Sequence, residues 1–349
     1  MAILQFVWPR CRTVSVVGMC KNAGKTVTMD TIASEAADAG IAVGLVSSGR
    51  DGEAVDAVTL REKPAVHVRA GFHVVTLERF LASERTTAQL EIVETTRFNT
   101  PLGRVVIARA TGPGTVEISG PGSVRKIREV VGTLHALGAG LVLVDGSIDR
   151  KALSTPALCD GTVLATGAAL GRDMEKVVRE TAHTVRLLSL PLAPEQLLAR
   201  GRELADERQN AVVASDGTWE QFGSTTLAGA DDVEARMNAD TVAVVLGGAL
   251  TGRSLPKRPP GCEVAICVQN PTRMFLDTEE LRILEGRGYR FSVLYSAPVL
   301  AVAVNPLAPD GFQFDRAEFF AAMKEALTPV PVIDVVPGDQ SSAACGMEG

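Results

Sequence analysis

The sequence is poor in aromatic residues and histidine, and its cysteines are thinly spread. Aromatic residues make up 4% of the 349 residues, so we expect a core built mainly from Val, Leu, Ile and Ala. The six cysteines form no C-x-x-C pair, and the four histidines show no spacing typical of metal ligands. These absences argue against a disulfide framework and against a zinc site, and we expect reduced thiols.

A basic surface and long apolar runs are also missing. The formal net charge is −6 and the pI is about 5.4, which does not favour a groove for nucleic acid. No apolar run reaches the ~20 residues of a membrane-spanning helix. The apolar stretch from Met1 to Trp8 lacks the basic start and long apolar centre of a signal peptide. We therefore expect a cytoplasmic protein that binds neither nucleic acid nor membranes.

What the sequence does contain is the composition of an ordinary globular protein. Hydrophobic residues make up 46% and charged residues 22%, so a sizeable core can be buried. The length favours two domains or one large α/β domain. We predict a nucleotide-binding domain over residues 1–190 and a second α/β domain over 191–339. The small, polar residues 340–349 are expected to form a disordered tail.

The stretch from Ser15 to Thr26 predicts a phosphate-binding loop. An apolar strand leads into a loop bounded by Gly18 and Gly24, and Gly-Lys-Thr then opens a helix. Small loop residues let backbone N–H groups turn toward a phosphate, and the positive end of the helix faces the same anion. The residues expected to bind the nucleotide are Lys21, Asn22, Ala23, Gly24, Lys25, Thr26 and Val27.

The spacing of this motif departs from the consensus G-x-x-x-x-G-K-[ST]. The first glycine of the consensus would fall on Met19, whereas Gly18 lies one position earlier. An ordinary strand-turn-helix with a coincidental Gly-Lys-Thr is the alternative. The strand before the loop and the helix after it are the context that the motif requires, and they favour a phosphate loop.

The first 46 residues also predict a parallel sheet. Residues 12–18 are typical of a strand, 25–38 of a helix and 41–46 of a second strand, which together make a βαβ unit. Loops at the carboxyl ends of parallel strands gather over a ligand. Asp51 and Glu53 lie in the loop after the second strand, so we expect them to position water or a metal ion. A solvated polar turn is the alternative.

Residues 140–145 form a second motif, a run of aliphatic residues that ends in Asp145. An acidic residue at the end of a buried strand can hold Mg²⁺ beside the hydroxyl of the phosphate loop. We therefore predict ATP and Mg²⁺ as cofactors, with Lys25, Asp51 and Asp145 as catalytic residues. The metal ligands that we expect are Thr26, Asp51, Glu53 and Asp145.

Other segments predict simple structural elements. Alternating residues over 89–95 and 104–109 predict a hairpin added to the parallel sheet, and 211–222 predicts a second hairpin with a tight Asp-Gly turn. Two Gly-Pro-Gly loops, at 111–115 and 119–123, either close over a ligand or are plain turns.

The spacing of the phosphate loop is similar to that of dethiobiotin synthetase and the cobyrinic-acid amidase group of P-loop proteins. The resemblance covers roughly the first 170 residues. It implies a P-loop NTPase fold with a mainly parallel sheet flanked by helices and with ATP–Mg²⁺ at the strand ends. It also implies nucleotide roles for Lys25 and Thr26, and Mg²⁺ roles for Asp51 and Asp145.

Four segments of the chain carry a second resemblance: Cys20–Thr26, Gly49–Glu53, Asp145–Lys151 and Thr166–Asp173. Together they resemble the P-loop subunit of lysine 5,6-aminomutase reactivase, a family that spans most of this length. That resemblance implies a protein that acts with a second subunit to restore a radical aminomutase whose adenosylcobalamin is damaged. The chain has no D-x-H-x-x-G pattern, so we do not expect it to bind cobalamin in that way.

Three functions remain open at the level of the sequence. The first is an ATPase that reactivates or assembles a client enzyme and therefore binds a protein client or partner subunit. The second is an ATP-dependent ligase of the dethiobiotin synthetase type that acts on a small carboxylate. The third is a nucleotide-binding structural subunit without turnover. ATP is preferred over GTP because no N-K-x-D motif is present, and a homodimer is an open possibility by analogy.

Overall fold

The chain folds into two compact units, which we describe separately. The computed structural model describes residues 2–47, 65–147, 158–223, 230–256 and 263–335. The first unit comprises Met1–Ser154, Leu158–Thr181 and Val299–Gly349, and the second comprises Thr155–Ala157 and Ala182–Pro298. These boundaries differ from the predicted division at 190/191, because the chain returns to the first unit after residue 298. The predicted tail, 340–349, lies outside the described residues.

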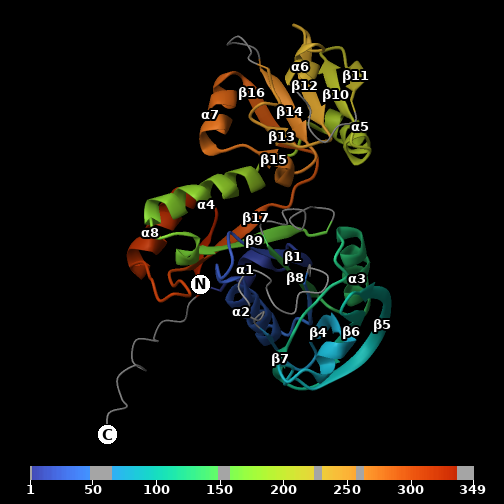
Figure 1. Cartoon of the computed structure of the whole chain (residues 1–349), viewed down its shortest axis with the longest axis vertical. Coiled ribbons are helices and arrows are strands. Elements are labelled where there is room, and N and C mark those ends of the chain that lie inside the picture. The colour runs from blue at the N-terminus through green and yellow to red at the C-terminus, as the bar shows by residue number, and fades with distance from the viewer. Residues whose placement is uncertain (1, 48–64, 148–157, 224–229, 257–262, 336–349) are drawn as a thin grey trace. The chain divides into compact units, whose positions relative to one another are not determined.

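The first unit contains a nine-stranded, mainly parallel sheet. Figure 1 shows helices such as α2 and α3 beside its strands. Only β6 runs against its neighbours, since it pairs antiparallel with both β4 and β5. The α/β class with a mainly parallel sheet is therefore confirmed, as is the predicted hairpin. In spatial order the strands are β18 (Val332–Asp334), β17 (Val299–Asn305), β9 (Gly161–Gly167), β1 (Thr13–Gly18), β8 (Leu141–Ser147), β2 (Val43–Ser47), β4 (His73–Leu77), β6 (Gly103–Ala110) and β5 (Leu90–Thr100).

Helices cover both faces of this sheet, which is why its central strands are almost continuously apolar. Met29 and Ile32 of α2 (Lys25–Asp38) pack in the same cluster as Leu143 of β8. Ile127 of α3 (Val124–Ala136) packs in the cluster that contains Val144 of β8. Since successive residues of a strand point to opposite faces, α2 and α3 lie on opposite sides of the sheet. The other elements of this unit are α1 (Leu4–Val7), β3 (Val66–Val68), η1 (Glu78–Ala82), β7 (Gly114–Val116), η3 (Ala168–Leu170) and α8 (Arg316–Leu327). Helix α4 (Met174–Leu188) belongs to this unit up to Thr181 and to the second unit from Ala182 on.

Each Gly-Pro-Gly loop contains a glycine at a close backbone approach. A Cβ on Gly120 would lie 1.8 Å from the carbonyl oxygen of Ser47, and a Cβ on Gly114 would lie 2.5 Å from the amide nitrogen of Ala88. Ser119 lies between β2 and β4, where its carbonyl accepts from the Ser47 N–H at 3.1 Å. These glycines therefore serve packing of the loops onto the sheet.

The second unit has a separate core around a five-stranded sheet of order β11-β10-β12-β14-β16. The sheet is parallel from β12 to β16, and the predicted hairpin of β10 and β11 is confirmed. Tyr289 is fully buried in this core and donates its hydroxyl hydrogen to the carbonyl of Pro256 at 3.0 Å. The elements are α5 (Glu195–Asp206), β10 (Asn210–Ala214), β11 (Trp219–Phe222), α6 (Ala230–Glu234), β12 (Thr241–Leu246), β13 (Leu250–Thr251), β14 (Val264–Val268), η4 (Pro271–Arg273), β15 (Met274–Phe275), α7 (Thr278–Gly286) and β16 (Tyr289–Val293).

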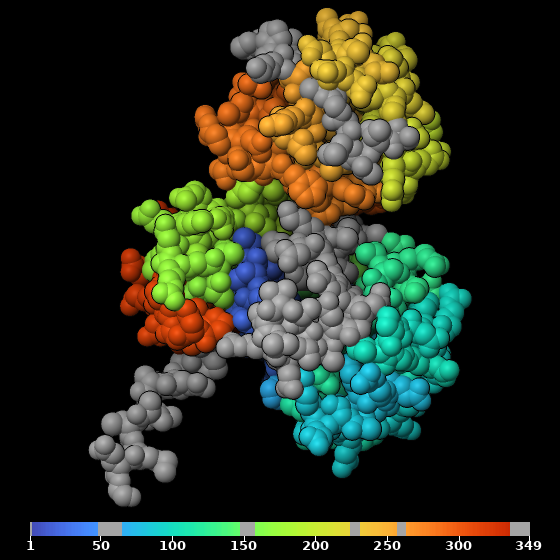
Figure 2. All heavy atoms as spheres, in the orientation of Figure 1, coloured from blue at the N-terminus to red at the C-terminus, as the bar shows by residue number. Residues whose placement is uncertain are grey.

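The surface of the first unit is shown in Figure 2, where the residues of β4, β5 and β6 (blue-green to cyan) gather at one side. The edge strand β5 is largely exposed and carries charged side chains such as Glu91 and Arg97. Charges on an edge strand discourage pairing with other chains. Within the described residues, we find no helix with the length and apolar character needed to cross a membrane.

Candidate functional site

The sheet brings the carboxyl ends of its central strands to one edge. Gly18, the last residue of β1, lies opposite Ser147 of β8 and Ala165 of β9. Ser47, the last residue of β2, lies opposite Asp145. The two sequence motifs, 15–26 and 140–145, therefore meet at the same edge, which is where parallel α/β sheets place their ligands.

The loop between β1 and α2 is a tight turn with two left-handed residues. Its first residue is anchored, since the Met19 N–H donates to the carbonyl of Ala165 at 2.8 Å. Asn22 and Gly24 are both left-handed, with φ of 61° and 96°. Left-handed residues within a tight turn direct successive N–H groups to one side, which makes a concave binding surface for anions. The two left-handed residues are compatible with such a surface, despite the longer spacing after Gly18.

The start of α2 adds a second feature that favours an anion. Gly24 is its N-cap residue, and in the described chain no side chain caps the helix or places an acidic group in its first turn. The Thr28 N–H and hydroxyl both donate to the carbonyl of Gly24 at 2.9 Å. The Thr28 hydroxyl therefore does not accept a hydrogen bond from the first N–H groups of the helix in this arrangement. Unpaired N–H groups and the helix dipole attract negative charge at this end.

Lys25 folds back over the loop toward β8. Its position is defined by Gly18, because a Cβ on Gly18 would lie 2.8 Å from Cγ and 2.9 Å from Cδ of Lys25. The ammonium nitrogen lies 3.6 Å from Oδ1 of Asp145, and the Ser47 hydroxyl donates to Oδ2 of Asp145 at 3.4 Å. The side chains of Lys25 and Asp145 keep 23% and 31% of their exposure, so this pair is accessible to a ligand.

Asn305 is a neighbour of the loop that sequence reasoning missed. A Cβ on Gly24 would lie 3.2 Å from Cβ and 3.5 Å from Nδ2 of Asn305. Oδ1 of Asn305 accepts the Leu307 N–H at 2.9 Å, which orients the side chain. Asn305 ends β17, which pairs with β9 in the first sheet. Residues 300–304 are predicted from the sequence to lie in the second domain, so Asn305 is not among the predicted site residues. Ligands lie at strand ends in parallel sheets, so a correct assignment of this strand would have identified Asn305 as a candidate.

The remaining predicted residues divide into three groups. Lys21 and Asn22 are exposed, Thr26 is half-buried and Ala23 is buried beneath the loop. Val27 is 42% exposed and lines a hollow on the outer side of α2, away from Asp145. Asp51 and Glu53 lie outside the described residues, so their predicted roles remain predictions.

Cys20 lies in the loop and is a protonated thiol at neutral pH. Burial raises its pKa from 9.0 to about 11, and the nearby Lys25 ammonium only partly opposes this shift. A thiolate is the reactive form of cysteine, so the side chain is a poor nucleophile. Other groups that could contact an anion here are the Lys25 ammonium, the loop amides and the Thr26 hydroxyl of α2.

The residues at the strand ends fit a hard cation better than a soft one. Asp145, Thr26 and Ser47 supply oxygen atoms, which Mg²⁺ prefers, and Mg²⁺ usually takes few protein ligands beside those of a phosphate. Throughout the described ranges, no group of three or more His, Cys, Asp or Glu side chains is arranged to hold a metal ion by itself. Beyond the described residues of this site, a Mg²⁺ ion would need further ligands, such as those of a bound nucleotide, water or the predicted Asp51 and Glu53. Comparison with known proteins identified no matching family model, no matching curated protein and no matching solved structure.

Proposed function

We propose that the first unit is a P-loop domain that binds and hydrolyses ATP with Mg²⁺. The observation that carries this proposal is the path of Lys25, which runs over Gly18 to within 3.6 Å of Asp145. This path aligns the positive groups of the loop with a carboxylate at the strand ends. A triphosphate with its metal ion requires both kinds of group within a few ångströms.

Each residue has a defined task in this proposal. The loop amides and Lys25 neutralise charge on the β- and γ-phosphates. Thr26 and Asp145 hold the Mg²⁺ shell, and Ser47 keeps the Asp145 carboxylate oriented through its hydrogen bond. When bound, Mg²⁺ supplies further charge neutralisation on the phosphates. Asp51 and Glu53, which follow β2 in the sequence, are proposed to position water or the metal ion.

We further propose that ATP turnover serves the reactivation or assembly of a client enzyme. The presence of the second unit supports this role. It is inserted between β9 and β17 and has its own core, so the chain holds a large folded region that a nucleotide site does not need. The resemblance to the P-loop subunit of lysine 5,6-aminomutase reactivase favours a cobalamin-dependent aminomutase as the client.

The test is Mg²⁺-dependent phosphate release by the purified full chain with ATP or GTP, beside the Lys25→Ala variant. Turnover that requires Mg²⁺ and that the substitution removes would support an NTPase, and the preferred nucleotide would be known. Tight Mg²⁺-dependent binding without turnover would support a site that needs a partner for hydrolysis. Phosphate release only with an added small carboxylate would favour the ligase instead, and absence of nucleotide binding would refute the proposal.

A further inference from the structure

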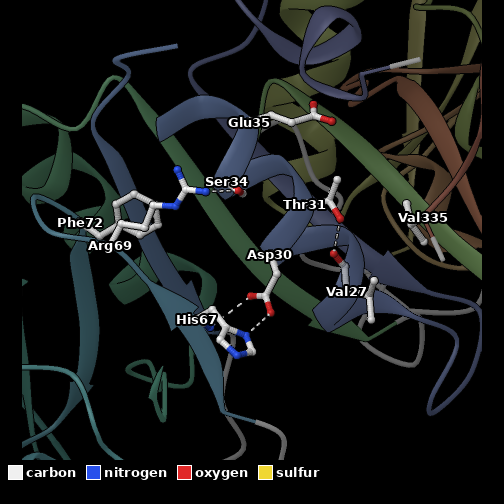
Figure 3. A pocket seen from close by; sticks show the side chains of 9 residues that line it. All are labelled: Val27, Asp30, Thr31, Ser34, Glu35, His67, Arg69, Phe72 and Val335. Carbon is white, nitrogen blue, oxygen red and sulfur yellow. Dashed lines mark hydrogen bonds and ion pairs between the residues drawn. The ribbon is translucent and has the colours of Figure 1, made fainter. Parts of the chain in front are cut away.

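A hollow of about 480 Å³ lies on the outer side of α2 in the first unit, apart from the strand ends. Figure 3 shows that the helix supplies its floor, while His67, Arg69 and Phe72 lie on one flank and Val335 on the other. Its volume is within the range of sites that bind small molecules. The helix contributes Val27, Asp30, Thr31, Ser34 and Glu35.

The charges of this hollow favour a cation. Asp30 and Glu35 both line it, and Asp30 retains only 23% of its side-chain exposure. The guanidinium of Arg69 is held at the rim by the Asp38 carboxylate and the Ser34 hydroxyl, so its charge is already compensated. An anion would be repelled by the two remaining carboxylates.

Apart from Arg69 and His67, which each contact a carboxylate, the polar side chains of the hollow can accept hydrogen bonds. Oδ1 of Asp30 accepts from the His67 backbone N–H at 3.3 Å, and Oδ2 lies 2.8 Å from Nδ1 of His67, but a carboxylate has four acceptor positions. One oxygen of Glu35 accepts from the Leu4 N–H at 2.8 Å. Thr31 gives its hydrogen to the carbonyl of Val27, which leaves its oxygen able to accept. An ammonium, with three donors and no acceptor, matches such a wall.

The rest of the lining is apolar. Val27 is 42% exposed and offers hydrocarbon surface beside the carboxylates, whereas Phe72 and Val335 are largely buried at the flanks. An organic cation with a short aliphatic stem places its charge and its stem against matching surfaces. Burial also raises the pKa of Asp30, although the contact with His67 opposes this, and a bound cation would stabilise its ionised form.

We propose that this hollow binds a free aliphatic amine or guanidine of a few carbon atoms, with its cationic group at Asp30 and its stem against Val27. This site is separate from the proposed nucleotide site and does not depend on it. A lysine side chain on a protein partner shares the ammonium chemistry. A hollow of about 480 Å³ favours the free molecule, because a single lysine side chain would fill only part of it.

The test is a ligand-observed NMR titration of the full chain with n-butylammonium and n-butylguanidinium. Matched probes are n-butanol and butyrate, which keep the stem and change the charge. We expect the cations to bind with millimolar dissociation constants and at least about tenfold more tightly than either matched probe. Asp30→Asn should weaken the binding of n-butylammonium by about tenfold, because a charge-assisted hydrogen bond is lost.

Glu129→Gln is the control, since Glu129 is a partly exposed carboxylate on α3 that pairs with Arg97. It should leave binding unchanged. If Asp30→Asn does not fold, Thr31→Lys places an ammonium inside the hollow and should compete with the probe. Equal binding of n-butanol, or full binding to both Asp30→Asn and Thr31→Lys, would overturn the cation site. Equal binding of N-acetyl-lysine N-methylamide would overturn the assignment to a free molecule.

Discussion

Lys25 and Asp145 meet at 3.6 Å although distant segments of the sequence supply them. Lys25 opens α2, Asp145 lies near the end of β8, and pairing of β1 with β8 sets their separation. The pair is partly exposed, so its own contribution to stability is small, below ~1 kcal/mol. We therefore infer that the Lys25–Asp145 pair serves ligand binding more than folding.

Lys25→Ala should abolish ATP binding at ordinary concentrations without unfolding the chain. Loss of the charge-assisted contacts to two phosphates is expected to weaken affinity by about 100-fold. Titration with a fluorescent ATP analogue measures the affinity, and thermal unfolding checks the fold. Lys176→Ala is the matched control, because Lys176 is an exposed lysine on α4 that pairs with Glu180. Affinity like that of the native chain in Lys25→Ala would remove the phosphate-loop assignment.

Asp145→Asn should weaken the binding of Mg²⁺–ATP but not the binding of ATP without Mg²⁺. Mg²⁺–ATP is expected to bind about tenfold more weakly and phosphate release to be lost, because a neutral amide is a poor Mg²⁺ ligand. ATP in the presence of EDTA should bind as well as to the native chain or better, since a carboxylate no longer repels the phosphates or holds Lys25. Both affinities can be measured with the same fluorescent analogue.

The control for that experiment is Glu91→Gln, which removes an exposed carboxylate paired with Arg109 on the β5–β6 hairpin. It should change neither affinity. An equal loss of binding with and without Mg²⁺ in Asp145→Asn would instead mean that Asp145 acts on the loop itself.

Gly18→Ala and Gly24→Ala should have different effects, although both lie in the loop. A Cβ at Gly18 meets the flexible stem of Lys25, so the lysine must move and ATP affinity should fall with little change in stability. A Cβ at Gly24 is strained by its φ of 96° and lies 3.2 Å from Asn305. We expect a loss of about 1–2 kcal/mol in the free energy of unfolding there.

Urea unfolding and ATP titration of each variant distinguish these effects. Gly132→Ala is the control, because Gly132 is an exposed interior residue of α3 with open space around it. That substitution should raise stability by about 0.5–1 kcal/mol and leave affinity unchanged. A stability loss in Gly18→Ala as large as in Gly24→Ala would contradict this account of Lys25.

Cys20 should make stability depend on pH in the alkaline range. Its pKa is about 11 in the folded chain and 9.0 in the unfolded chain, so the folded state holds the proton more tightly. The resulting stabilisation is fully present below pH 9 and is lost as the pH rises toward 11. Urea unfolding between pH 8 and 10.5 should therefore show a steeper decline in the native chain than in Cys20→Ala. Identical slopes would mean that Cys20 is solvated like a free thiol.

The local elements of this protein follow closely from its sequence. The helix over 25–38 was predicted at the residues where it occurs, because Gly24 and Gly40 bound a segment with buried positions at helical spacing. The parallel sheet follows from the βαβ order of residues 12–46. Continuous aliphatic runs such as 140–145 agree with it, since strands covered on both faces are apolar throughout. The tight turn at Gly217 was likewise predicted from an Asp-Gly pair.

Tertiary structure alone decided which strands share a sheet and what lies beside the loop. The sequence of residues 300–304 is compatible with a strand of either unit, because the residues of a buried strand do not indicate which strands it pairs with. Pairing of β17 with β9 placed Asn305 against Gly24, and pairing of β1 with β8 placed Asp145 within reach of Lys25. The hollow beside Asp30 likewise exists only because β3 and Val335 flank α2 in space. Residue types and spacing thus determined the elements and the chemistry that they carry, while long-range backbone hydrogen bonds determined which of these groups meet.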